Sequence, residues 1–282
     1  MRRTLAAVTG VGMLLGAFLI AAHSRAREPV PLTACADPND LPFSNEARQG
    51  FENKIAALIA ADLHHPLRYV WWSQRRGFAR KTLGAGRCDL WLGVAQGMEH
   101  VASTQPYYRS TYLFVTRAAD PLANLTLDDP RLRERLIGVQ LLGSDASNTP
   151  PAHALAERGL TANVRGFMIY GDAASSHPSA AILDALVQRQ IDVALVWGPQ
   201  AGYYARHSAV ALRLEPVVPD DDPSAPMTYA ISMAVRSENA PLRRLIEASL
   251  ESQAPRIHAL LEEYGVPQLP LERERKVVSS AR

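Results

Sequence analysis

The stretch that decides the fold is LTACADPNDLPFSNEARQGFEN, residues 32–53. It begins as a short apolar segment, is broken at Asp37-Pro38 and again at Leu41-Pro42, and continues with apolar residues at a helical period. The stretch therefore predicts a strand, a polar loop and a helix. In an open α/β sheet, the loop that follows the carboxyl end of a strand faces the crevice where ligands bind.

This loop supplies the first candidates for recognition, which are Asp37, Asn39, Phe43, Ser44 and Asn45. The alternative interpretation is that Asp37, Asn39 and Asn45 only make turn hydrogen bonds to their own backbone, as such residues do in most loops. The sequence leaves both interpretations open.

Alternating strand and helix patterns continue along the chain. Strands are expected at 67–72, 88–94, 111–117, 136–141, 164–170 and 191–197, and helices at 150–158, 178–190 and 241–264. A break rich in Asp, Pro and Asn at 120–130 separates two such series. We therefore predict an α/β fold of two lobes joined by a two-segment hinge, with lobe 1 at 30–118 plus 217–268, lobe 2 at 119–216 and a flexible tail at 269–282.

The first residues have the order of a secretory signal. Met-Arg-Arg is followed by an apolar run at 5–22 and by small residues at Ser24 and Ala26. We expect cleavage after residue 26 and a periplasmic protein without a membrane span. Because the run is close to the roughly 18 to 20 residues that cross a bilayer, an uncleaved anchor is the alternative.

Cys35 and Cys88 both lie in the part expected to be exported. If their strands are neighbours, an oxidising compartment would allow a disulfide. Two buried free thiols are the alternative.

Other function classes find no support in the sequence. The net charge is +2, which gives no indication of a nucleic-acid surface. No nucleophile elbow or spaced histidine pair is present, and the adjacent acids Asp220, Asp221 and Asp222 read as solvated side chains. We therefore predict neither catalytic residues nor a metal site, and a monomer.

Five strings occur in one order: CADPN at 35–39, LPFSN at 41–45, GFENKIA at 50–56, WW with RRGF at 71–78, and PYYRS at 106–110. This set is similar to the quinoprotein-dehydrogenase-associated periplasmic binding-protein-like family. More widely, segments 107–108, 136–144 and 191–204 resemble family 3 extracellular solute-binding proteins, over about residues 32 to 265. The resemblance implies a periplasmic binding protein type II fold without catalysis.

The narrower resemblance also implies a role as accessory to a PQQ-dependent methanol or alcohol dehydrogenase. The partner would be the dehydrogenase or its cytochrome c, with transient contact to PQQ and no permanently bound cofactor. The alternative is a receptor that delivers a small polar solute to an ABC permease.

The sequence departs from amino-acid receptors of the wider family at two positions. Those receptors bind the ligand carboxylate with an Arg shortly before the Pro-Tyr motif, where this chain has 96–100, QGMEH. They bind the ammonium with an Asp where alignment on Pro199 puts Trp197. Since an unpaired buried charge costs several kcal/mol, amino-acid capture is not expected. Trp197 and Met98 instead predict a more apolar cleft, suited to a ring, an apolar solute or a protein segment.

The complete set of predicted cleft residues combines loop positions with these aligned ones: Asp37, Asn39, Phe43, Asn45, Arg75, Tyr107, Arg109, Gly143, Ser144 and Trp197. Arg75 and Arg109 could contact an anion such as a PQQ carboxylate, or form salt bridges and cover apolar surface. The Gly143-Ser144 loop could present backbone N–H groups to an anion, although Asp145 adds an opposing charge.

Overall fold

The computed structural model describes residues 30–141, 148–168, 178–219 and 222–271. The opening stretch folds as predicted, into strand β1 (Leu32–Ala36), the small hairpin β2 (Asn39–Asp40) and β3 (Ser44–Asn45), and helix α1 (Phe51–Asp62). Gly50 allows the loop to turn tightly into α1, since a Cβ there would lie 2.0 Å from the Phe43 carbonyl oxygen. The hairpin is thereby held against the start of α1.

We call the part of the molecule built around β1 the β1 half. Its central strands form a parallel sheet. Strand β1 pairs in parallel with β4 (Leu67–Trp71) and β5 (Leu90–Ala95), and the short helix α2 (Phe78–Lys81) lies between them in sequence. Strands β12 (Thr228–Val235) and β6 (Ala102–Ser103) extend this sheet in the antiparallel sense. The sheet is therefore mixed, with the predicted parallel strands on one side.

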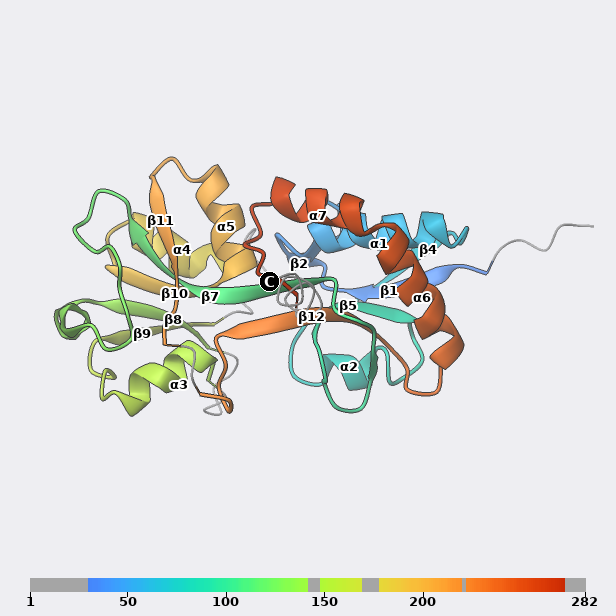
Figure 1. The fold of residues 1–282 in the computed structure, drawn as a ribbon, viewed down its shortest axis with the longest axis horizontal. Coiled ribbons are helices and arrows are strands. Elements are labelled where there is room, and N and C mark those ends of the chain that lie inside the picture. Colours follow the sequence, from blue (N-terminus) through green and yellow to red (C-terminus); the bar gives the residue numbers. More distant parts are fainter. Residues whose placement is uncertain (1–29, 142–147, 169–177, 220–221, 272–282) are drawn as a thin grey trace, which may run out of the picture.

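Strand β7 (Tyr108–Arg117) connects the two halves of the molecule. Its first four residues pair with β12, and from Tyr112 onward it pairs with β10 (Val193–Trp197) and β11 (Leu212–Pro216). Figure 1 shows β7 running through the centre, with α1, α6 (Ala240–Ser252) and α7 (Ala254–Glu263) toward one end of the molecule and α4 (Ala181–Val187) and α5 (Gly198–His207) toward the other. One continuous strand thus belongs to both halves.

The β8 half, the part built around β8, repeats the strand and helix alternation. Strand β8 (Ile137–Leu141) lies between β10 and β9 (Val164–Met168), both parallel to it. The helical elements of this half are η1 (Pro130–Glu134), α3 (Pro150–Glu157), η2 (Pro178–Ala180), α4 (Ala181–Val187) and α5 (Gly198–His207). Fully buried Ile137 and Leu155 lie in one core of this half, and Ile182 and Leu186 lie in another.

The last helical stretch differs from the sequence prediction. Residues 241–264 form two helices, α6 (Ala240–Ser252) and α7 (Ala254–Glu263), with Gln253 between them. Pro255 explains the break, because proline lacks an N–H and its ring clashes with the preceding turn of a helix. Both helices pack on the β1 half, where Ile246, Ile257 and Leu261 join the same core as Phe51 and Ile55.

Cys35 and Cys88 form a disulfide, with 5.6 Å between their Cα atoms. Cys35 lies in β1, and Cys88 lies just before β5, which pairs with β1. Both cysteines are buried beside Phe78 and Trp91. With a sequence separation of 53, the bond contributes on the order of 4 kcal/mol on the chain-entropy model.

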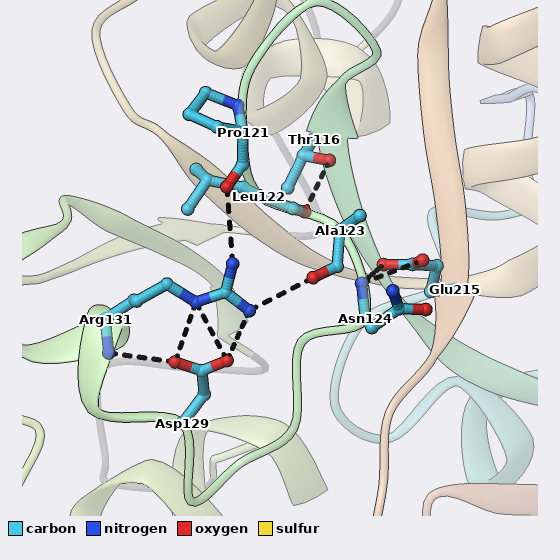
Figure 2. Close-up of polar contacts among 8 residues, drawn as sticks. All are labelled: Thr116, Pro121, Leu122, Ala123, Asn124, Asp129, Arg131 and Glu215. Carbon is cyan, nitrogen blue, oxygen red and sulfur yellow. Dashed lines mark hydrogen bonds and ion pairs between the residues drawn. The ribbon is translucent and has the colours of Figure 1, made fainter.

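The segment that follows β7 is fixed by arginines. Figure 2 shows Arg131 donating hydrogen bonds to the carboxylate of Asp129 and to the carbonyls of Pro121 and Ala123. The backbone N–H of Asn124 donates to Glu215 of β11 in the same view. The hydrogen bonds of Arg131 hold the crossing segment, residues 118–131, together, and the Asn124 contact ties it to β11 of the β8 half.

Several predictions concern residues that the structure does not describe, namely the leader at 1–26 and the end of the tail at 272–282. The lobe boundaries stay a proposal; they assign all of β7 to lobe 1, although its second part pairs with β10 and β11. In the described part of the chain, no helix is both long and apolar enough to cross a membrane.

Candidate functional site between the two halves

A cavity of about 950 Å³ lies between the two halves, at the upper end of the size range of small-molecule sites. The β1 half supplies most of its wall, including Phe43, Phe78 and Trp91. The β8 half supplies Gln140, Trp197 and Gln200, and Tyr112 and Tyr229 come from the paired strands β7 and β12. Ser179 of η2 donates to the Leu41 carbonyl at 2.9 Å, so the halves also touch at the β2–β3 loop.

Four acidic side chains line this cavity: Glu99 and Glu238 are exposed, and the other two, Asp40 and Glu52, are less accessible. Glu52 is 9% exposed, and its Oε1 lies over Gly93, where a Cβ would come within 2.1 Å of that oxygen. Burial, and next the charge of Asp40, raises the pKa of Glu52 to about 8. Burial, and next the charge of Asp37, raises the pKa of Asp40 to about 8. Near neutral pH, both groups are therefore largely protonated in the cavity as it stands.

Three aromatic side chains meet at the junction of the halves. The Trp197 ring lies 5.2 Å from that of Tyr112 and 5.9 Å from that of Tyr229, both edge to face. All three line the cavity. We call Tyr112, Trp197 and Tyr229 the aromatic cluster. It gives this wall of the cavity apolar surface with polar ring edges.

A buried amide pair fixes the position of Trp197. Gln140 Nε2 donates to Gln200 Oε1 at 2.6 Å, and Gln140 Oε1 accepts from the Trp197 N–H at 3.2 Å. Thr149 in turn donates to the Gln140 carbonyl at 2.7 Å. The end of β10 is thereby held to β8 and to the start of α5.

Arginines line the mouth of the cavity. Arg75, Arg76 and Arg80 are exposed, whereas Arg236 is half-buried and donates to the Cys88 carbonyl at 2.7 Å. Arg236 also pairs with Glu238 at 3.2 Å. The positive charges thus lie toward solvent and the two carboxyls deeper in the β1 half.

Of the predicted site residues, the structure places Phe43, Arg75 and Trp197 in the wall of the cavity. Met98, which the sequence also singled out as apolar surface, lines the cavity and is 39% exposed. Gly143 and Ser144 lie outside the described residues.

Five other predicted residues do not line the cavity: Asp37, Asn39, Asn45, Tyr107 and Arg109. Asp37 accepts from the N–H groups of Asn39 at 2.8 Å and Gln74 at 2.5 Å, and Asn45 accepts from the Gln49 N–H at 2.7 Å. Asp37 and Asn45 therefore make the loop hydrogen bonds of the alternative interpretation. Arg109 lies between cavity residue Tyr108 and Ser110 in β7, where successive side chains point to opposite faces.

Sequence reasoning missed Asp40, Glu52 and the aromatic partners of Trp197. Asp40 lies in the loop that was singled out, so its proximity to Asn39 was the available signal. Glu52 gave no such signal, because acids are common in the first turn of any helix, where they interact favourably with the helix dipole.

A separate group of possible metal ligands lies outside the cavity. In the described part of the chain, His153, Glu157 and Asp222 bring three ligand atoms within 4.8 Å of one another. His153 and Glu157 are one turn apart on α3, with 3.2 Å between the imidazole and the carboxylate. Both side chains are about half exposed, so water competes for them.

Comparison with known proteins places this geometry in a family. The crystal structure of the periplasmic binding protein XoxJ from Methylobacterium extorquens AM1 is 36% identical, with a TM-score of 0.70, covering 85% of this chain and 100% of that one. MxaJ from Methlophaga aminisulfidivorans MPT is 25% identical with a TM-score of 0.71, covering 84% of this chain and 100% of that one. Protein MoxJ of Methylorubrum extorquens is 29% identical over 248 residues, 82% of this chain and 79% of its own.

More distant similarities concern the fold alone. Solved amino-acid solute-binding proteins share it at 18% identity, with TM-scores of 0.64 and 0.60. No model of a known protein family matches the chain. The predicted type II periplasmic binding protein fold is confirmed, and the chain belongs to the MoxJ, XoxJ and MxaJ family of periplasmic binding proteins.

Proposed function

We propose that this protein is a non-catalytic periplasmic accessory factor of a PQQ-dependent methanol or alcohol dehydrogenase. It would assist maturation or activation of that enzyme by binding the enzyme, its cytochrome c or, transiently, its cofactor. Family membership supports the dehydrogenase system as the setting.

The observation that carries the proposal is the position of Trp197 in the cavity. Trp197 packs between Tyr112 and Tyr229, at the position where amino-acid receptors of this fold are expected to place a carboxylate. A tryptophan there cannot take the role of that carboxylate, so an amino acid held in the manner of those receptors would lose the partner of its α-ammonium, which costs several kcal/mol in a buried site. The aromatic cluster instead offers the apolar and amphipathic surface that protein segments and rings bind.

The experiment uses a deletion strain together with purified components. We expect deletion to lower periplasmic dehydrogenase activity, and the wild-type protein to restore it and to retain the dehydrogenase on an affinity column. Trp197→Ala should restore less activity. Trp72→Ala is the matched control, since Trp72 is similarly half-buried but does not line the cavity. Normal activity in the deletion strain, with no retained dehydrogenase, would remove the proposal.

A second candidate function is a receptor for a small polar solute, favoured by one observation. The cavity holds the buried amide pair Gln140 and Gln200 and two carboxyls, which a protein-docking groove does not need. A panel of solutes read by thermal shift separates the two functions. A micromolar ligand should raise the melting temperature by mass action, and no small molecule should do so if the cavity serves a protein partner.

A further inference from the structure

The side chain of Glu52 has a position that the fold alone does not explain. It is nine-tenths buried, faces the cavity, and makes no side-chain hydrogen bond or ion pair with any described residue. Buried carboxyl groups are normally hydrogen-bonded or paired, because a lone one loses its hydration without compensation. A cation that enters the cavity would favour the ionised carboxylate over the neutral acid and would supply its missing partner.

Its surroundings favour an acidic site in the buried part of the cavity wall. Asp40 lines the same wall and is close enough for its charge to act on Glu52. Burial, and next the charge of Glu52, raises the pKa of half-buried Tyr107 and of buried Tyr108, and neither side chain can supply a positive charge. The arginines Arg75, Arg76 and Arg80 are exposed at the mouth, where solvent screens their repulsion of an incoming cation.

The remaining wall selects the kind of cation. A metal ion prefers several oxygen ligands at once, and the cavity does not bring three acidic or histidine ligands together among the described residues. The aromatic cluster, with Phe43 and Tyr108, instead surrounds an occupant with ring surface. Ring faces attract ammonium and guanidinium groups and cover their apolar stems.

We propose that the cavity binds an organic cation, an alkylammonium or guanidinium group, against the carboxyls of Glu52 and Asp40, with the aromatic cluster covering its apolar part. The group can come from a free amine or from a lysine or arginine side chain of a partner protein. Only the second source rests on the proposed function.

The first experiment measures calorimetric binding of butylammonium and butylguanidinium, with 1-butanol as the neutral control of equal length. Wild-type protein should bind each cation at least tenfold more tightly than butanol. Glu52→Gln should remove that preference, and Trp197→Leu should weaken binding of all three probes. Glu46→Gln is the matched control, because Glu46 is exposed and does not line the cavity.

The second experiment measures binding of the purified dehydrogenase to the same variants. If the cation belongs to the partner, Glu52→Gln should weaken this complex at least tenfold while Glu46→Gln leaves it unchanged, whatever the small probes do. Circular dichroism and a melting curve establish that each variant folds, and Asp40→Asn takes the place of Glu52→Gln if the latter does not.

The outcomes are distinct. Cation preference that depends on Glu52 supports the site with a free amine, and a dehydrogenase complex that depends on Glu52 supports it with a partner side chain. If neither binding depends on Glu52 or Asp40, the site does not exist. A dehydrogenase that binds no variant, together with a cation preference that Glu52→Gln removes, would leave the site standing and remove the proposed function.

Discussion

Carboxyl groups have opposite surroundings at the two ends of strand β7. Beyond its carboxyl end, in the crossing segment, Asp120 lies 2.6 Å from the Arg117 guanidinium, and Asp129 lies 2.6 Å from that of Arg131 (Figure 2). Beside its amino end, in the cavity, Glu52 and Asp40 have no such partner among the described residues. The acids of the crossing segment are thus ion-paired, whereas Glu52 and Asp40 have no ion pair among the described residues.

The pKa of Asp129 and those of the two cavity carboxyls shift in opposite directions. Hydrogen bonds from Arg131 hold the pKa of Asp129 below its usual value, whereas burial and the neighbouring acid raise the pKa of Glu52 and Asp40 to about 8. Perturbed groups in a cleft mark candidate functional sites, because a fold has no structural reason to keep a destabilising charge there. The comparison indicates that the crossing segment serves the architecture and the cavity carboxyls serve binding.

The largest expected effect is on the architectural side. Arg117 is 4% exposed, donates to the carbonyls of Leu186 and Ile191, and pairs with Asp120. Arg117→Met would leave those carbonyls without this donor and the Asp120 carboxylate with only the exposed Arg189 nearby, so we expect a loss of about 3 to 5 kcal/mol in the free energy of unfolding. Urea denaturation measures it.

The control for this prediction is Arg189→Gln. Arg189 also approaches Asp120, at 3.6 Å, but its side chain is 68% exposed. Removing it should cost less than about 1 kcal/mol, since exposed ion pairs contribute little. Equal losses in the two variants would mean that burial does not distinguish these pairs.

The second prediction concerns Glu52 in the cavity. Its effect on the free energy of unfolding is of intermediate size and has the opposite sign, because the substitution should stabilise the protein. The pKa of Glu52 is higher in the folded protein than in the unfolded chain, so the folded state holds its proton to higher pH and stability falls as pH rises from about 4 to about 8. Glu52→Gln removes this loss. We expect the variant to equal wild type near pH 4 and to be more stable by about 1 to 4 kcal/mol at pH 8 and above.

Denaturation curves at pH 4, 6 and 8 test this prediction. Glu46→Gln, at an exposed position, should follow the wild-type pH profile. If Glu52→Gln is less stable than wild type at pH 8, Glu52 has a stabilising partner and the contrast with Asp129 fails.

The sequence predicts the strands and helices better than it predicts the cavity side chains, and the reason is physical. Strands and helices follow from local periodicity, and the opening strand, loop and helix at 32–62 are as expected. Strand β7 begins earlier than the predicted 111–117, because pairing with β12 extends it to Tyr108, and such pairing is not local. The break at Gln253 was within reach, since Pro255 is visible in the sequence.

The site was predicted where a strand end or the family resemblance pointed to it. Trp197 was found through the alignment on Pro199, and Phe43 and Arg75 because they lie in loops that follow strands. Asp40 was missed although its neighbours were named, since loop side chains follow no period that gives their direction. Glu52 was missed because its position depends on Gly93, which is 41 residues away in sequence and leaves the space that its carboxyl occupies.

The smallest effect expected is at Asp129, which begins η1 and accepts a hydrogen bond from the Arg131 N–H at 2.9 Å. Asp129→Ala removes this cap and should lower the free energy of unfolding by about 1 kcal/mol at pH 7. Because the pKa of Asp129 is lower in the folded state than in the unfolded chain, its contribution is present above the unfolded pKa and is lost as pH falls through the folded pKa. The free energies of unfolding of the variant and wild type should therefore converge in acid. Those of Glu52→Gln and wild type should converge there too, from the opposite side.

Asp128→Ala is the matched control, since Asp128 is 66% exposed and its ion pair with Arg158 should contribute little. If Asp129→Ala and Asp128→Ala lower the free energy of unfolding equally at pH 7, the contacts drawn in Figure 2 do not hold the crossing segment. The contrast between its acids and those of the cavity is then lost.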